Sequence, residues 1–500
     1  MTGALNAPSA APSAARWEAV IGIEVHCQLR TASKMFCSCS SAYDGAPPNT
    51  HTCPVCLGLP GALPTINRQA VEHVLTTGIA IDATTPPATR WDRKNYFYPD
   101  LPKGYQISQF DLPLASMGRL AVETSQGTVV VGITRAHLEE DTAKLIHATD
   151  AAGSRVSLVD FNRSGVPLME IVTEPDLRTA EQARRYAEEL QLLLRAIGVS
   201  DADMERGQMR VEANVSLRPV GSVPFGIRAE VKNMNSFRAV ERAIAYEIER
   251  QAAVLDGGGS IDQETRGWDD GRGATYVMRS KEDSHDYRYF PEPDLPPLRV
   301  DPAWLERLRA ALPERPVDRR RRYVETLGLS PYDAAVIVAD PRAVALFDVL
   351  VAAEVPAKQA ANWVSGEYLR LARKYPVGED ATILDPAHLG AELAGLIKLQ
   401  VAEQITLQNA REVLEAHVAS GQAMSAIVEA RGLRRISDDE SLRSVVTAVL
   451  AANPKAVADH RAGRPTVGFL VGKVMKETGG QAHAERVRSL LVEELERSAG

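Results

Sequence analysis

The chain has 500 residues, of which 45% are hydrophobic and 24% are charged, enough to build about three soluble domains. Its formal net charge of −8 excludes a uniformly basic nucleic-acid binder, so contacts with nucleic acid must come from local basic patches. No apolar run is long enough to cross a bilayer, which predicts a cytoplasmic protein without a membrane segment.

The first 16 residues are rich in Ala, Pro and Ser. They lack the basic start and the apolar centre of a signal peptide, so residues 1–16 are predicted to be a disordered tail.

Residues 17–296 are predicted to form a mixed α/β domain with many short strands. Two helices interrupt the strands, because apolar residues recur at helical spacing over Thr179–Gly198 and Ser236–Leu255. The predicted strands include Ala19–Val25, Thr128–Leu138, Met209–Leu217 and Gly226–Lys232.

Four cysteines lie within twenty residues of this domain, as a C-x-C pair and a C-x-x-C pair: Cys37, Cys39, Cys53 and Cys56. Two such half-sites predict a tetrahedral zinc site with four thiolate ligands, closed to substrate and therefore structural. The alternative is ordinary free thiols in a turn. The only other cysteine is Cys27, which follows His26 directly. Neighbouring side chains of a strand point to opposite faces, so Cys27 should point away from His26, which argues against a catalytic role for it.

Four strands carry carboxylates and basic residues on one face, since every second side chain of a strand points the same way. An antiparallel sheet with a wet outer side is the alternative for any one strand. Carboxylates beside arginines favour a magnesium–nucleotide phosphate site, although no P-loop motif is present. We predict that nucleotide phosphate or substrate charge is bound by Arg210, Arg228 and Lys232. The four faces hold Glu24, His26 and Gln28; Arg135, His137, Glu139 and Asp141; Arg210, Glu212, Asn214 and Ser216; and Arg228, Glu230 and Lys232.

Two segments interleave basic residues with aromatics, Lys94–Tyr105 and Met278–Phe290. This composition suits stacking on a base beside phosphate, with Arg279, Lys281 and Arg288 as candidate phosphate contacts. A proline-braced loop packed on the core is the alternative for the first segment.

The proline-rich strip Pro291–Pro297 predicts a domain border. Beyond it the sequence is helical, and we expect one helical domain over 297–385 and another over 386–500. Helical modules of this kind typically serve docking.

Several long motifs together resemble the GatB/GatE family, which includes the B subunits of glutamyl/aspartyl-tRNA amidotransferases. The resemblance spans nearly the whole chain after residue 17. The matching motifs are Ile21–Leu29, Lys34–Cys37, Cys53–Gly61, Arg93–Gln109, His137–Lys144, Asp160–Val172, Met278–Pro296 and Gly468–Lys476.

The resemblance implies an α+β protein: a glutamine-synthetase-like cradle with a mostly antiparallel sheet, a helical domain and a YqeY-like tail that binds tRNA. It implies a carbon–nitrogen ligase with glutamine as nitrogen donor, acting on misacylated Glu-tRNA(Gln) or Asp-tRNA(Asn). With ATP and Mg²⁺ this chain would phosphorylate the side-chain carboxylate. Ammonia would come from a GatA-type amidase subunit, in a heterotrimer with a GatC-type small subunit.

By motif, the resemblance implies that Glu24, His26 and Glu139 are catalytic metal-site residues, with Glu170 and Glu212 as further ligands. It also supports zinc at the four cysteines, which only some members keep.

Two other readings remain open from the sequence. One is a stand-alone ligase of glutamine synthetase type, against which the long helical tail argues. The other is a zinc-stabilised tRNA-binding scaffold, against which the carboxylate-rich strands argue.

Overall fold

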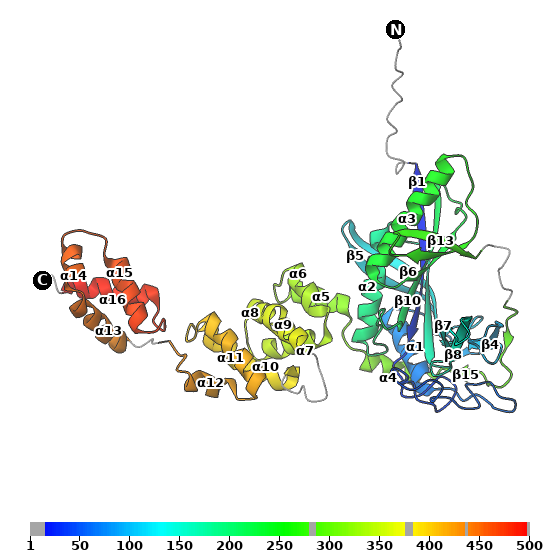
Figure 1. Cartoon of the computed structure of the whole chain (residues 1–500), viewed down its shortest axis with the longest axis horizontal. Helices are drawn as coiled ribbons and strands as arrows, with labels where there is room; N and C mark the ends of the chain where they lie inside the picture. Colours follow the sequence, from blue (N-terminus) through cyan, green and yellow to red (C-terminus); the bar gives the residue numbers. More distant parts are fainter. Residues whose placement is uncertain (1–15, 280–286, 376–383, 436–438, 498–500) are drawn as a thin grey trace, which may run out of the picture. The chain divides into compact units, whose positions relative to one another are not determined.

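The structure, a computed structural model, describes residues 16–279, 287–375, 384–435 and 439–497. The predicted tail therefore lies outside the described residues, except for Arg16. The chain divides into two compact units, the first ending at Val317 and the second beginning at Asp318. Strands are described only in the first unit, and the second is helical throughout its described part, which confirms the α+β class (Figure 1).

The first unit is built on an eight-stranded sheet with the order β13-β12-β11-β10-β1-β9-β6-β5. Neighbouring strands are antiparallel except β11 and β12, which confirms a mostly antiparallel sheet. The strands are β1 (Trp17–Gln28), β5 (Ala115–Thr124), β6 (Gly127–Glu140), β9 (Pro167–Thr173), β10 (Met209–Pro219), β11 (Ala229–Met234), β12 (Thr265–Asp269) and β13 (Ala274–Arg279).

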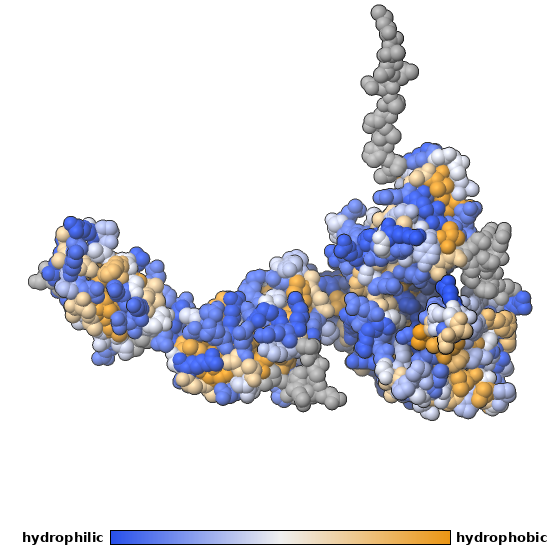
Figure 2. Space-filling view, in the orientation of Figure 1, coloured by the Kyte–Doolittle hydropathy of each residue, from blue (hydrophilic) through white to orange (hydrophobic). Residues whose placement is uncertain are grey.

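One face of this sheet is apolar and packs against helices. Ile21, Ile23 and Val25 of β1 are at most 1% exposed and belong to one core. That core is completed by the apolar sides of α1 (Arg68–Ala80), α2 (Ala180–Ala196) and α3 (Phe237–Asp256). The outward sides of α2 and α3 are mainly hydrophilic (Figure 2). The other face of the sheet is left for polar side chains.

The two predicted helices begin where a hydroxyl side chain caps them. The hydroxyl of Thr179 accepts from the backbone N–H of Gln182, and that of Ser236 accepts from the N–H of Ala239. These bonds satisfy donors that have no partner within the first helical turn. Both helices are confirmed within two residues at each end.

The predicted domain border at 296/297 differs from the observed end of the first unit. The chain after the proline-rich strip returns to this unit: β15 (Leu298–Arg299) pairs with β2 (Ala88–Thr89), and the indole N–H of Trp304 donates to Glu72 at 3.0 Å. The remaining elements here are β3 (Asp92–Asn95), β4 (Tyr105–Ser108), the hairpin β7 (Lys144–Thr149) and β8 (Arg155–Asp160), β14 (Phe290–Pro291) and α4 (Pro302–Ala311).

The second unit is built of helices, and the last of them share one buried apolar cluster that includes Val446, Val474 and Leu491. Gly390 of α10 lets that helix approach α7 closely, because a Cβ there would lie 2.3 Å from a methyl carbon of Val349. No described helix is both long and apolar enough to span a membrane. The elements are α5 (Pro316–Glu325), α6 (Pro331–Val338), α7 (Pro341–Ala352), α8 (Ala357–Asn362), the π-helix Trp363–Tyr368, α9 (Leu369–Lys374), α10 (Pro386–Val401), α11 (Leu407–Ser420), α12 (Met424–Ala430), α13 (Asp439–Ala452), α14 (Pro454–Arg461), α15 (Val467–Glu477) and α16 (Ala484–Arg497).

Candidate active site

The polar face of the main sheet holds a row of four side chains from four adjacent strands. His26 on β1 stands opposite Arg210 on β10 and opposite Glu170 on β9. Glu170 in turn stands opposite His137 on β6. Register partners project from the same face, so the strand pairing brings together residues that are far apart in the sequence.

This row forms part of the floor of a cavity of about 520 Å³. Asp141 also lines the cavity. It directly follows the end of β6 and is the last of the alternating polar residues Arg135, His137, Glu139 and Asp141. Seven of the predicted site residues line it: Glu24, His26, Glu139, Glu170, Arg210, Glu212 and Lys232.

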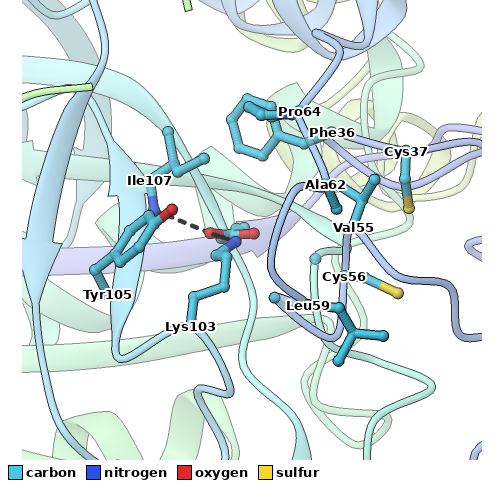
Figure 3. A pocket seen from close by; sticks show the side chains of 13 residues that line it. Phe36, Cys37, Val55, Cys56, Leu59, Ala62, Pro64, Lys103, Tyr105 and Ile107 are labelled. Atoms are coloured by element: carbon cyan, nitrogen blue, oxygen red, sulfur yellow. Dashed lines mark hydrogen bonds and ion pairs between the residues drawn. The ribbon is translucent and has the colours of Figure 1, made fainter. Parts of the chain in front are cut away.

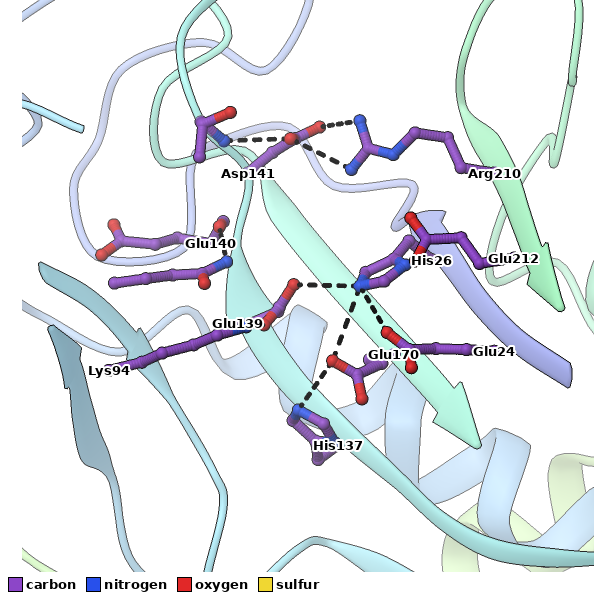
Figure 4. Close-up of polar contacts among 12 residues, drawn as sticks. Glu24, His26, Lys94, His137, Glu139, Glu140, Asp141, Glu170, Arg210 and Glu212 are labelled. Atoms are coloured by element: carbon purple, nitrogen blue, oxygen red, sulfur yellow. Dashed lines mark hydrogen bonds and ion pairs between the residues drawn. The ribbon is translucent and has the colours of Figure 1, made fainter. Parts of the chain in front are cut away.

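Three carboxylates surround the imidazole of His26 (Figure 4). Its Nε2 atom lies 3.5 Å from Glu24 Oε1, 3.7 Å from Glu139 Oε1 and 3.5 Å from Glu170 Oε2. We call Glu24, His26, Glu139 and Glu170 the acidic cluster. Two overlapping ligand sets are close enough to hold a metal ion: Glu24, His26 and Glu212, and His26, Glu139 and Glu170.

Burial and mutual charge shift the pKa values of the residues in the acidic cluster. Burial and the charge of Glu170 raise the pKa of Glu24 to about 7, and burial raises the pKa of Glu139. Burial lowers the pKa of His26, but its hydrogen bond to Glu170 and the charge of Glu139 outweigh this and raise it to about 9. Without a metal, His26 therefore supplies positive charge to the cluster.

One oxygen of the acidic cluster has no hydrogen-bond donor. Glu139 is 2% exposed, and its Oε2 atom accepts no hydrogen bond from any described residue. The ammonium of Lys94 is 3.9 Å away from it. A buried carboxylate oxygen without a hydrogen-bond donor is costly, and an ammonium at this distance offsets only part of the cost. The donor set therefore suits a bound metal.

Basic residues surround the acidic cluster, as the strand patterns predicted, with one exception. The ammonium of Lys232 lies 2.7 Å from Glu212, and Arg210 lies 3.2 Å from Asp141. Arg228 does not line this cavity: it is exposed and precedes β11, which begins only at Ala229. Before this strand the chain passes close to β10 at Gly226, where an added Cβ would lie 2.0 Å from the carbonyl oxygen of Leu217.

Aromatic rings form one wall of the cavity. Tyr96, Phe110, Tyr287 and Tyr289 line it, and the rings of Phe110 and Tyr289 stack with centroids 4.2 Å apart. The ammonium of Lys94 lies 5.1 Å from the centroid of the Tyr287 ring. Both predicted aromatic segments thus contribute to the cavity.

Part of the second aromatic segment lies outside the described residues. Lys281 lies outside the described residues, as does the rest of 280–286, and the side chain of Arg279 is not described. Arg288 is exposed.

The four predicted zinc ligands converge in the loop between β1 and α1. Their sulfur atoms all lie within 4.8 Å of one another, and we call Cys37, Cys39, Cys53 and Cys56 the cysteine cluster. A hydrogen bond with Cys37 lowers the pKa of Cys56 to about 4, which favours a thiolate there. A small cavity of about 110 Å³ beside it is lined by apolar side chains and the Lys103–Glu140 ion pair (Figure 3).

Cys27 is separate from both clusters. It is fully buried on the apolar face of β1, and its sulfur lies 3.0 Å from the hydroxyl of Ser200. Burial raises the pKa of its thiol to about 12. The prediction that Cys27 and His26 point to different faces of β1 is confirmed.

Comparison with known proteins matches both units. A family model described as the GatB/GatE catalytic domain matches residues 19–306, and one described as a GatB domain matches residues 345–495. The chain belongs to the GatB/GatE family. The catalytic-domain match extends past the predicted border at 296/297, as the fold of the first unit does.

Relatives of this GatB/GatE chain match it over nearly its whole length. A protein of Moorella thermoacetica is 53% identical over 480 residues, covering 96% of this chain and all of the relative. One of Carboxydothermus hydrogenoformans is 48% identical over 482 residues, with 96% and 99% coverage. One of Thermosynechococcus vestitus is 49% identical over 488 residues, with 96% of each chain covered. All three are named as B subunits of aspartyl/glutamyl-tRNA(Asn/Gln) amidotransferases.

Four of the cavity residues absent from the predicted site lie beside or next to the acidic cluster. Arg135, His137 and Asp141 were assigned to the correct strand face but given no role, and Lys94 was noted only for its composition. Two sequence patterns could have identified these residues: the alternation of polar side chains along β6, and the Lys94–Tyr105 segment, which belongs to a motif shared with the GatB/GatE family. What the sequence lacked was the register, which sets Glu170 beside His137, and the packing of a separate small sheet that brings Lys94 of β3 to 3.9 Å from Glu139.

Proposed function

We propose that this chain is the carboxylate-activating and tRNA-binding component of a tRNA-dependent amidotransferase. It would use ATP to phosphorylate the side chain of Glu on tRNA(Gln), Asp on tRNA(Asn), or both, in a ligase complex that takes nitrogen from glutamine. The names of the full-length relatives support the substrate class. The observation that carries the chemistry is the acidic cluster, flanked in one cavity by Lys94, Arg210 and Lys232.

The acidic cluster fits a magnesium ion. Hard divalent cations take carboxylate oxygens, and this site offers three carboxylates around His26 and the unpartnered Oε2 of Glu139. Glu24, His26 and Glu139 would be the principal ligands, with Glu170 and Glu212 as further ones. A bound magnesium ion would neutralise charge on the transferring phosphoryl group.

The basic residues of the cavity would bind the phosphates. Burial lowers the pKa values of Lys94 and Lys232, but the nearby Glu139 and Glu212 outweigh this, so both stay protonated. Arg210 adds a planar guanidinium that suits phosphate oxygens. Arg228, outside the cavity, remains only a prediction from the sequence. The aromatic wall would take the adenine base, because every base offers a face for stacking.

The reaction needs no covalent intermediate on the protein. A side-chain carboxylate oxygen attacks the γ-phosphorus of ATP, and ADP leaves. Ammonia then attacks the acyl phosphate carbon, the C–N bond forms and inorganic phosphate departs. The protein's part is to position the two reactants and to stabilise the phosphoryl charge.

The cysteine cluster fits a structural zinc ion. Four sulfur atoms within 4.8 Å of one another match a tetrahedral thiolate site, and four protein ligands leave no open position for substrate. Zinc would fix the loop between β1 and α1 beside the cavity.

Partner proteins and tRNA are part of the proposal. The relatives are each named as one component of a multi-subunit enzyme, which supports an assembly. For this assembly we propose an amidase-type subunit that releases ammonia and a small third subunit. The helical second unit, from Asp318 onward, would dock the tRNA, while the first unit would hold the chemistry. We place the complex in the cytoplasm, where translation consumes its product.

The test is ATP consumption by the chain co-purified with an amidase-type subunit and a small subunit. ADP should form only when Glu-tRNA(Gln) or Asp-tRNA(Asn) is supplied, and the active tRNA identifies the substrate. Formation of AMP would overturn phosphoryl transfer in favour of adenylation. ADP formation with free glutamate would favour a stand-alone ligase, and no nucleotide turnover with either tRNA would favour a tRNA-binding scaffold.

A further inference from the structure

Four polar side chains form a hydrogen-bonded chain from the cysteine-bearing loop to the cavity. The hydroxyl of Tyr43 donates to Gln28 Oε1 at 3.0 Å, and Gln28 Nε2 donates to Asp141 Oδ2 at 2.8 Å. Arg210 Nη2 donates to Asp141 Oδ1 at 3.2 Å. We call Tyr43, Gln28, Asp141 and Arg210 the relay.

Two members of the relay, Gln28 and Arg210, donate to one buried carboxylate, that of Asp141. Asp141 is 2% exposed and Gln28 is 7% exposed, so water does not compete strongly for these bonds. Burial would raise the pKa of Asp141, but the charges of Arg210 and Arg163 hold it below its usual range. The ionised carboxylate fixes the Gln28 amide with its nitrogen toward Asp141 and its oxygen toward Tyr43.

Asp141 has little freedom to do anything else. Its Oδ1 atom also accepts from the backbone N–H of Thr142 at 2.9 Å, and Arg163 Nε lies 3.8 Å from Oδ2. Arg163 is itself tied to the backbone carbonyls of Thr142 and Ala143. The carboxylate therefore has one fixed orientation and is a poor candidate for a base.

Among the described residues, Arg210 is hydrogen-bonded on one side only, to Asp141. Two of its nitrogens, Nη1 and Nη2, face Asp141 at 3.5 and 3.2 Å, while the side chain is 36% exposed and lines the cavity. Arg210 is the register partner of His26 at the centre of the acidic cluster. A guanidinium fixed at one edge keeps its other donors available for phosphate oxygens.

We propose that Asp141, Gln28 and Tyr43 are positioning residues that hold the Arg210 guanidinium in the orientation that binds the nucleotide phosphates. The proposal rests on the function proposed above. Tyr43 lies between Cys39 and Cys53 in the sequence. The loop that carries the cysteine cluster is therefore tied to the phosphate side of the active site through one hydroxyl group.

The test uses the full chain co-purified with its partner subunits and compares Asp141→Asn and Tyr43→Phe with the wild type. Direct titration with ATP and magnesium should give a Kd raised about tenfold for Asp141→Asn and about threefold for Tyr43→Phe, as expected for a weakened hydrogen bond. In the turnover assay KM for ATP should rise in parallel, while the KM for misacylated tRNA stays unchanged. Tyr332→Phe, at a tyrosine 77% exposed on α6, is the matched control for removal of a hydroxyl.

A double-mutant cycle separates positioning from general support of the fold. In an Arg210→Lys background, Tyr43→Phe should cause no further rise in Kd, because the relay acts only through the guanidinium. An equal threefold rise in both backgrounds, or an unchanged Kd for folded Asp141→Asn, would overturn the proposal. If the wild type binds ATP but forms no ADP with either tRNA, the proposed function fails. The Kd values for ATP still show in that case whether the relay positions Arg210. A wild type that binds no ATP would overturn both.

Discussion

The acidic cluster and the cysteine cluster are both suited to metals, but they are built in different ways. The acidic cluster draws its ligands from β1, β6 and β9 in the middle of a sheet, and it faces a cavity of about 520 Å³ with basic and aromatic walls. The cysteine cluster draws all four ligands from one loop and has a cavity of only about 110 Å³ beside it.

This difference separates a site for chemistry from a site for structure. Three carboxylates in a sheet place oxygen ligands where a substrate phosphate can also reach the metal. Four thiolates complete a tetrahedral shell and exclude substrate. We therefore expect damage to the acidic cluster to abolish the reaction, and damage to the cysteine cluster mainly to weaken the fold.

The largest effect is expected at the acidic cluster. Glu139→Gln removes a charged ligand without changing side-chain size, so ADP formation with misacylated tRNA should fall by about 10²- to 10³-fold. Binding of the tRNA should be unchanged. Glu123→Gln, at an exposed glutamate on β5, is the control and should retain wild-type turnover. Full turnover by folded Glu139→Gln would remove the acidic cluster from the mechanism.

The cavity boundary is tested by two neighbouring basic residues. Lys232→Gln should raise KM for ATP about tenfold, since a charge-assisted contact to phosphate is lost. Arg228→Gln should leave KM within about twofold, because the exposed side chain contributes little at the surface. The reverse order of effects would mean that Arg228 moves into the site when substrate binds.

The pH dependence of magnesium binding tests the role of His26. In the metal-free chain the pKa of His26 is raised from its ordinary value near 6.5 to about 9. The folding stability that protonated His26 contributes is therefore fully present below about pH 6.5 and is lost as the pH rises through about 9. A metal must displace this proton, so magnesium affinity should rise with pH up to about 9, by at most about tenfold per unit. Calorimetry in two buffers near about pH 8, above the pKa of about 7 of Glu24, should detect the released proton, and His26→Gln should reduce its amount.

The smallest effect on turnover is expected at the cysteine cluster. Cys53→Ser should reduce bound zinc from about one ion per chain to near none, because thiolates dominate such sites. The melting temperature of the complex should fall, while turnover per folded chain falls less than about tenfold, since no cysteine touches the cavity of the acidic cluster. Ser38→Ala is the control within the same loop. A loss of turnover as large as that of Glu139→Gln would contradict the division between the two clusters.

The sequence was sufficient to predict strand faces and helix positions wherever the spacing of nearby residues determines them. A period of two put Glu24 and His26 on one face of β1 and Cys27 on the other, and helical spacing with a hydroxyl cap located α2 and α3. It failed where contacts distant in sequence decide. β11 begins only at Ala229, after the predicted start of the strand, and Arg228 stays exposed outside the cavity.

The domain border shows the same limit. Proline-rich segments usually mark linkers, but here β14 and β15 pair with strands some 200 residues earlier, so the chain remains in the first unit to Val317. The grouping of the acidic cluster likewise required the pairing of β1 with β9 and of β9 with β6. Sequence motifs named its members, whereas only the register showed that Glu139, Glu170 and Glu24 meet at one imidazole.

The most direct measurement of the central claim follows the oxygen atoms of the substrate. Misacylated tRNA whose side-chain carboxylate carries ¹⁸O is turned over by the complex with unlabelled ATP and glutamine, and the phosphate released is analysed by mass spectrometry. If the carboxylate attacks the γ-phosphorus, one ¹⁸O atom passes to inorganic phosphate for each amide formed. Unlabelled phosphate, or label recovered in AMP, would contradict the account.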